Sequence, residues 1–161
     1  MNASLEQTIE RLATDAEIRD LAARFSDAVN RRDFDAFGDL FTENGVWEIG
    51  EPFPSRAAGR ENVATMLRNL WAPWDFFFQM THTGVIDVAP DRQTATARWQ
   101  MQEVARSPDG SQSYDNLAMY DDRLVRTHDG SWRFAERRYR YIWLSSADLV
   151  GRSIPRQDDP A

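Results

Sequence analysis

The hydrophobic period of this chain changes once, from about 3.6 residues in the first half to about 2 residues in the second. Short turns separate the alternating runs of the second half, and strands joined by short turns pair as antiparallel neighbours. We therefore expect an α+β fold, a cone-shaped barrel in which N-terminal helices pack over a strongly curved, mostly antiparallel sheet. Such a cone encloses a cavity, which is the default place for a ligand.

Three helices are predicted from apolar spacing and from the residues that flank it. They cover about residues 5–32, as one helix or two abutting ones, then 34–41 and 60–71. Ser4 and Asp33 are suited to cap the first two helices. Asn44-Gly45 is expected to end the second helix with a turn, and Pro73 to stop the third.

Five strands are predicted. The first is short, at 46–50, and prolines make the stretch from there to Gly59 a loop. The other four are long and cover about residues 78–89, 94–106, 113–127 and 131–144. The last turn contains His128 in a His-Asp-Gly sequence that is typical of an exposed hairpin, so we expect no chemistry at this histidine.

The composition limits the class of protein. A length of 161 residues with 42% apolar content indicates one domain, here residues 1–145, followed by a polar and loosely ordered tail at 146–161. The net charge of -7 argues against a nucleic acid or an anionic membrane as partner. The absence of cysteine excludes disulfides, thiolate metal sites and thiol nucleophiles, and is compatible with the cytoplasm. We expect neither a signal peptide nor a membrane span.

No sequence motif indicates a cofactor. The chain has no glycine-rich phosphate loop, no serine-centred nucleophile elbow and no histidine-rich ligand set. We therefore expect no nucleotide cofactor and no zinc. The basic run at 137–140 alternates along a predicted strand and is interpreted as a solvated or subunit-facing surface.

His82 is the main candidate for chemistry, because it is one of two histidines and interrupts an apolar strand pattern. An imidazole titrates near neutral pH, so a ring held in an apolar pocket is a ready proton acceptor. The alternative is a core histidine satisfied by hydrogen bonds.

Three segments resemble the SnoaL-like branch of the nuclear-transport-factor-2-like superfamily, which also holds scytalone dehydratase, ketosteroid isomerase and limonene epoxide hydrolase. These segments are residues 28–37 with 40–47, the dipeptide Thr81-His82, and residues 120–126 with 129–135. The resemblance covers about residues 14–144 and implies the cone fold. It implies far less about the reaction, because one fold hosts many chemistries.

In the dehydratase-like and dehydrochlorinase-like members, a strand histidine acts as general base and a helix aspartate orients it. His82 matches the histidine, but the position of the aspartate holds Asn30, which can bind an imidazole and cannot supply charge. Asp27, three residues earlier, is a replacement candidate or a solvated helix acid. Asp121 is a second candidate, with a surface pair to Arg123 as the alternative.

Aromatic and sulfur-containing side chains are expected to shape the pocket, although a purely structural core would also explain them. The predicted substrate-binding residues are Trp47, Trp74, Phe78, Trp99, Met101, Met119 and Tyr141. The hydroxyl of Tyr120 or of Tyr141 is a candidate for polarising a carbonyl group, and the sequence does not choose between them.

The leading hypothesis is a cofactor-free lyase or isomerase, dehydratase-like or cyclase-like, for a hydrophobic cyclic small molecule of natural-product (polyketide) or xenobiotic metabolism. His82 would abstract a proton, oriented by Asn30, Asp27 or Asp121. The alternatives are a non-catalytic small-molecule-binding module and a scaffold subunit that resembles the beta subunit of ring-hydroxylating dioxygenases. A homodimer is expected, since the outer face of a long sheet is normally covered.

Overall fold

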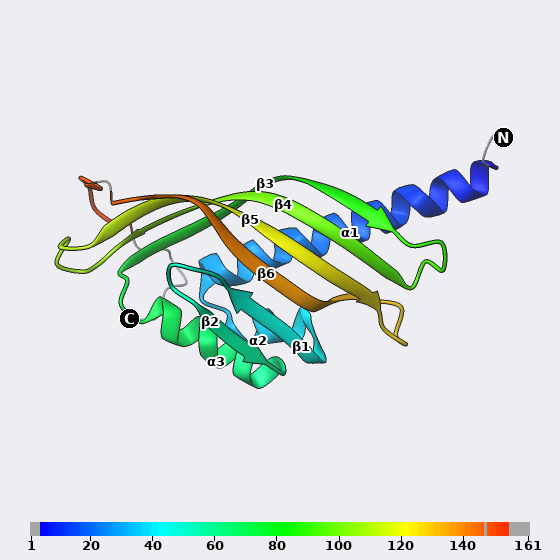
Figure 1. Ribbon diagram of the computed structural model, residues 1–161, viewed down its shortest axis with the longest axis horizontal. Coiled ribbons are helices and arrows are strands. Elements are labelled where there is room, and N and C mark those ends of the chain that lie inside the picture. Colours follow the sequence, from blue (N-terminus) through cyan, green and yellow to red (C-terminus); the bar gives the residue numbers. More distant parts are fainter. Residues whose placement is uncertain (1–3, 147, 155–161) are drawn as a thin grey trace.

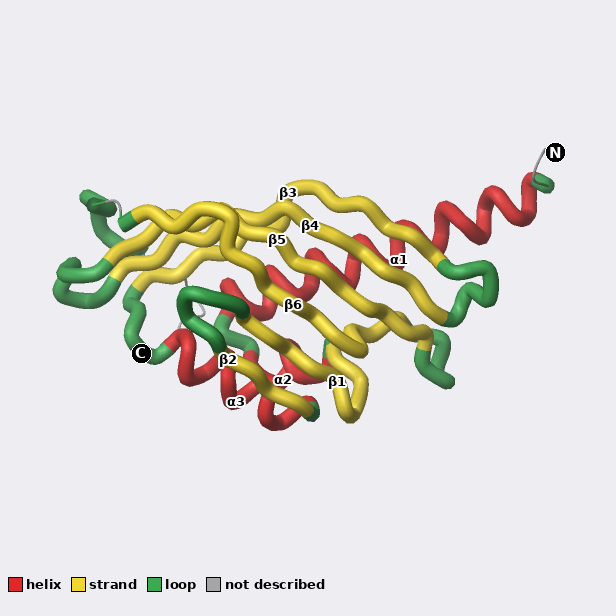
Figure 2. Tube along the Cα trace, viewed as in Figure 1, coloured by secondary structure: helices red, strands yellow, loops and turns green. Residues whose placement is uncertain are grey.

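The computed structural model describes residues 4–146 and 148–154, in which six strands form one curved sheet and three helices lie against one side of it (Figures 1 and 2). The helices are α1 (Leu5–Arg31), α2 (Phe34–Asp39) and α3 (Arg60–Trp71). The strands are β1 (Phe41–Ile49), β2 (Ser55–Ala58), β3 (Phe76–Val88), β4 (Thr94–Arg106), β5 (Ser113–Arg126) and β6 (Trp132–Ser145). The order across the sheet is β2-β1-β6-β5-β4-β3, and β1 and β6 are its parallel pair. The α+β class inferred from the sequence is confirmed.

Helix α1 is one continuous helix. Ser4 and Gln7 form a capping box at its start, in which the Ser4 hydroxyl accepts a hydrogen bond from the Gln7 backbone N–H at 3.3 Å. Arg32 ends the helix in the left-handed conformation with a φ of 58°. The first turns project beyond the sheet (Figure 1), which leaves Leu5 and Ile9 exposed. None of the described helices combines the length and the apolarity that a membrane span requires.

The short elements around β1 differ from the prediction. Helix α2 is capped by Asp33 as expected, but it ends at Asp39, and Asn44-Gly45 lies inside β1 instead of in a turn. The pairing of β1 with β6 shifts register between Phe41 and Val46. A Cβ atom at Gly45 would lie 2.9 Å from the carbonyl oxygen of Phe134, so the glycine permits a close backbone approach at this bulge.

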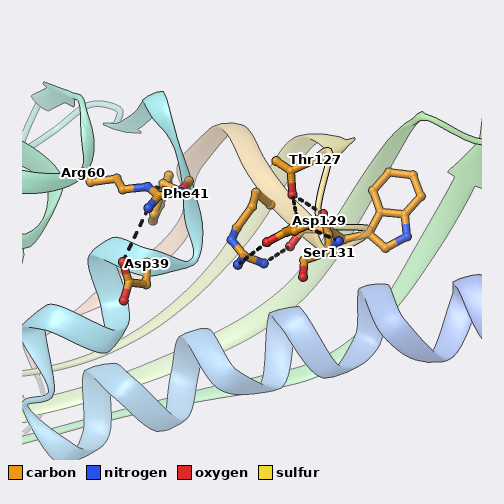
Figure 3. Close-up of polar contacts among 8 residues, drawn as sticks. Asp39, Phe41, Arg60, Thr127, Asp129 and Ser131 are labelled. Carbon is orange, nitrogen blue, oxygen red and sulfur yellow. Dashed lines mark hydrogen bonds and ion pairs between the residues drawn. The ribbon is translucent and has the colours of Figure 1, made fainter.

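Strand β2 was not predicted, because its four residues are flanked by Pro54 and Gly59 and are too few to show a period. Nearby, the Arg60 side chain donates a hydrogen bond to the Phe41 carbonyl at 2.9 Å and lies 3.6 Å from the Asp39 carboxylate (Figure 3). This contact joins the start of α3 to the end of α2.

The four long strands lie within two residues of their predicted bounds. The last turn illustrates why such turns can be recognised: Asp129 accepts hydrogen bonds from the Thr127 hydroxyl at 2.6 Å and the Ser131 backbone N–H at 3.0 Å (Figure 3). His128 in this turn is exposed, as expected. Of the predicted tail at 146–161, the described residues 146 and 148–154 form no helix or strand, and residues 147 and 155–161 lie outside the described residues.

The core is aromatic and is centred on Phe25 of α1. Its ring lies 4.6 to 6.3 Å from the rings of five others, namely Phe37, Phe41, Trp47, Tyr120 and Phe134. These rings join the helix to the inner faces of β1, β5 and β6, and their burial stabilises the packing of the helix on the sheet.

Arg137 corrects the interpretation of the basic run at 137–140 as surface. It is fully buried, its guanidinium lies 3.8 Å from the Tyr120 ring centroid, and Nη1 lies 3.3 Å from the Asp122 carboxylate. Asp122 in turn accepts a hydrogen bond from the Trp99 indole at 2.8 Å. Strand parity places Arg137 on the inner face together with Tyr139, so only Arg138 and Arg140 of the run are exposed.

Candidate active site

A cavity of about 350 Å³ opens between α3, the C-terminal end of α1 and the inner face of the sheet. Aromatic side chains form much of its wall, namely Trp47, Phe53, Trp71, Trp74, Phe77, Tyr114, Tyr120, Tyr139 and Tyr141. The polar side chains of the wall include Gln79, Glu103 and Asn116, which come from β3, β4 and β5. An apolar cavity with a few convergent polar groups has the usual composition of a small-molecule site.

The wall carries one ionisable side chain besides the tyrosines among its described residues, the carboxyl group of Glu103. This carboxyl group lies at the centre of a hydrogen-bonded network. Its Oε1 atom accepts from the Gln79 side-chain amide at 2.6 Å. Its Oε2 atom accepts from the Tyr139 hydroxyl at 2.7 Å and from the Asn116 side-chain amide at 3.0 Å. The Asn116 amide also donates to the Tyr139 hydroxyl at 3.1 Å. All three partners of the carboxylate are neutral.

Burial raises the pKa of Glu103 above its ordinary range, and the hydrogen bonds from Tyr139, Gln79 and Asn116 oppose this rise only in part. Desolvation also raises the pKa values of Tyr114, Tyr120, Tyr139 and Tyr141. The phenols therefore stay protonated and can donate hydrogen bonds. A buried carboxyl group with a raised pKa is a stronger base than an exposed one and can accept a proton from a ligand.

Glu103 was not among the site residues predicted from the sequence, although the alternation of β4 indicates that it faces inward. Trp99 and Met101 alternate on β4, and the same alternation places Glu103 on the inner face between Met101 and Ala105. A charged residue at a core position of a strand is rare unless it has a function or a partner.

The expected position of His82 is wrong, because the residue is exposed and is not part of the cavity wall. Gln79 and Thr81 of β3 face inward, and the Thr81 hydroxyl lies 2.7 Å from that of Ser26 on α1. After Thr81 the pairing of β3 with β4 shifts register, and a Cβ atom at Gly84 would lie 2.2 Å from the Trp99 ring. His82 therefore falls on the outward side of a bulge, while Trp99 occupies the space above Gly84.

The other predicted catalytic residues do not gather around the imidazole. Asn30 is half-buried, and its side chain exchanges two hydrogen bonds of 2.8 Å with the backbone of Gln79. Asp27 is exposed and lies 2.9 Å from Arg31. Asp121 shares a face with Arg123 as expected, but this is the outer face, where Asp121 accepts from Arg140 at 3.0 Å. Its neighbour Asp122 is the inward acid.

Three of the predicted substrate-binding residues line the cavity, namely Trp47, Trp74 and Tyr141. Four do not. Trp99 and Met101 are buried in the packed core instead, at 3% and 1% exposure. Phe78 and Met119 lie on the outer face of the sheet, because their strand positions are one residue out of phase with the inward Phe77 and Tyr120. Within the described residues, no three histidine, aspartate or glutamate side chains are placed to hold a metal ion together.

Comparison with known proteins gives one family match. The family model of the SnoaL-like domain matches residues 10–138. A search of curated proteins gives no significant match.

Solved structures share the fold at low identity. A hexachlorocyclohexane dehydrochlorinase, LinA-type3 from Novosphingobium barchaimii LL02, has a TM-score of 0.80 at 19% identity, covering 92% of this chain and 99% of the other. A scytalone dehydratase-like protein from Novosphingobium aromaticivorans has a TM-score of 0.76 at 19% identity, covering 91% and 99%. ActVI-ORFA from Streptomyces coelicolor has a TM-score of 0.68 at 19% identity, covering 81% and 98%.

Proposed function

Because this chain belongs to the SnoaL-like domain family, we propose that it is a cofactor-free enzyme of the lyase or isomerase class. Its substrate is a hydrophobic cyclic small molecule that binds in the aromatic cavity. Glu103 transfers the proton in the reaction, in place of the histidine that the sequence suggested. Two of the structural neighbours are named a dehydrochlorinase and a dehydratase-like protein, and both names denote the loss of a small acid or water from a substrate.

One observation carries this proposal: a carboxyl group with a raised pKa lies in the wall of an otherwise largely apolar cavity. A positioned general base contributes about 10²- to 10⁴-fold to a rate, and its effect is largest when its pKa is near the working pH. Exclusion of water by the aromatic wall strengthens each electrostatic interaction with the reacting group.

Solvent-exchange spectroscopy tests the proposal without knowledge of the natural substrate. Fused bicyclic ketones, with and without an amino substituent, are incubated with the protein in D₂O, and loss of the α-hydrogen signal is followed by proton NMR. We expect the protein to accelerate exchange for at least one ketone, and the Glu103→Gln variant to lose about 10²-fold or more of that acceleration. The Glu61→Gln variant is the matched control, because Glu61 is an exposed residue of α3 outside the cavity wall.

A second candidate function is a non-catalytic binding module with the same cavity. It is favoured by the three hydrogen bonds that the oxygens of Glu103 already accept from protein groups. Ketones that bind to the wild-type protein and to Glu103→Gln with no accelerated exchange in either would favour this function over the enzyme.

A further inference from the structure

We infer that the ligand of this cavity carries a protonated amine with at least one N–H group on its hydrophobic ring system, and that Glu103 binds this amine. The inference rests on the proposed function and names the substrate class of the same site. It is carried by the charge of the wall, by its aromatic faces and by its unpartnered acceptors.

Glu103 gives the wall of the cavity a negative charge. Glu103 is the wall's carboxylate, and none of the arginines in the described residues lines the cavity with it. The other buried acid of the inner face, Asp122, has Arg137 at 3.3 Å. The partners of Glu103 are two amides and a phenol, so nothing in the described network neutralises its charge. A buried charge is costly unless a counter-charge accompanies it, and a ligand cation supplies one.

The wall also presents the faces of aromatic rings to a ligand. Rings from β1, α3, β3, β5 and β6 surround the space beside Glu103, and they include Trp47, Trp71, Tyr139 and Tyr141. The π-face of an aromatic ring attracts a cation, and a set of such rings around an ammonium group is a recurrent mode of amine recognition. The same faces repel an anion, so a carboxylate or phosphate ligand fits this cavity poorly.

The wall also offers buried hydrogen-bond acceptors to a ligand. The side-chain amides of Gln79 and Asn116 both direct their NH₂ groups to the Glu103 carboxylate, which fixes the orientation of each amide. Their oxygens, Oε1 and Oδ1, are buried and have no hydrogen-bond partner in the described part of the chain. A carboxylate accepts about four hydrogen bonds, and Glu103 accepts three. This cluster of acceptors matches the N–H donors of a primary or secondary ammonium group.

Binding of such a ligand couples to a proton. Burial raises the pKa of Glu103, so its carboxyl group holds a proton to higher pH than an exposed glutamate does. A cation beside it stabilises the ionised form, which is the form that accepts a proton from a substrate, and lowers this pKa again. The affinity for an amine therefore rises with pH as long as the amine itself stays charged.

Calorimetric titration with three isosteric probes tests the inference: naphthylethylamine, naphthylethanol and naphthylacetate. For the wild-type protein at neutral pH we expect the amine to bind about tenfold or more tightly than the alcohol, and the acetate to bind most weakly. In titrations repeated over a range of pH, the affinity for the amine should rise across the range in which Glu103 titrates, and the affinity for the alcohol should not. In Glu103→Gln the affinity difference between amine and alcohol should fall to about threefold or less, whereas Glu61→Gln should retain it.

The outcomes separate this inference from the proposed function. An alcohol or an acetate that binds to the wild-type protein as tightly as the amine overturns the inference and leaves the proposed enzyme intact. Retention of the amine preference in Glu103→Gln also overturns it. If none of the probes and none of the bicyclic ketones bind, both the inference and the proposed function fail. The comparison of amine, alcohol and acetate uses only the wild-type protein, so it decides the question even if the variant does not fold.

Discussion

At the scale of single residues, the described part of the chain contains two buried carboxyl groups with different surroundings. Glu103 faces a cavity and neutral donors, whereas Asp122 faces Arg137 and the Trp99 indole. Burial raises the pKa of Asp122 to about 6, and Arg137 and the Trp99 hydrogen bond counter only part of that rise. The ion pair is thus retained in the core although desolvation outweighs its attraction.

This raised pKa predicts how Asp122 contributes to stability. Between about pH 4 and pH 6 the native protein holds the Asp122 proton more tightly than the unfolded chain does, so this group's contribution to the free energy of unfolding falls as the pH rises. Asp122→Asn keeps an acceptor for Trp99 and removes the titration. We expect the difference in free energy of unfolding, wild type minus variant, to decrease from pH 4 to pH 6.5 in urea denaturation. A difference that grows over this range would mean that Arg137 lowers the pKa of Asp122 below its ordinary value.

At the scale of elements, the contact between α1 and β3 holds one side of the cavity. Asn30 exchanges two hydrogen bonds with the backbone of Gln79, whose side chain contacts Glu103. Asn30, which the sequence suggested as a partner of His82, therefore holds the backbone of Gln79 in place instead. It acts on the site by positioning the Gln79 side chain.

Asn30→Ala should lower the free energy of unfolding by about 1 to 3 kcal/mol, because it leaves a half-buried backbone N–H and C=O of Gln79 without their partner. Asp27→Ala, on the exposed face of the same helix, removes only the surface pair with Arg31. It should change the free energy of unfolding by less than about 1 kcal/mol. Urea denaturation at neutral pH measures both. Equal effects of the two variants would show that the contact of α1 with β3 does not depend on Asn30.

At the scale of the whole molecule, the outer face of the sheet carries exposed apolar residues. Leu117 and Trp143 are cross-strand neighbours with 47% and 64% exposure, and Met80 lies in the same row across β4. This row supports the expectation that a second copy covers the sheet.

We predict a homodimer whose mass, measured by light scattering after gel filtration, falls to that of a monomer in the double variant Leu117→Lys, Trp143→Ser. Leu12→Lys is the matched control, because Leu12 is an exposed apolar residue of α1, a helix that packs on the other face of the sheet. A wild-type protein that is monomeric at micromolar concentration would contradict the prediction.

The sequence predicts the elements better than it predicts which face of each strand lies inside. Periodicity located the long strands and α3 because many residues repeat the signal, whereas β2 is too short to repeat it. Asp121 and Asp122 are adjacent on β5, and parity assigns them to opposite faces without saying which face is inner. The curvature of the sheet and the β3 bulge decide that, and both depend on contacts between residues far apart in sequence, such as Gly84 with Trp99.

The wall of the cavity combines buried polar side chains with an exposed apolar rim. Asn116 and Glu103 are 1% and 7% exposed, whereas Phe53 at the rim is 59% exposed. If a ligand binds with its recognised group at Glu103, we expect its substituents near Phe53 to extend toward water. We therefore expect the protein to accept a series of compounds that share one head group and differ in their tails.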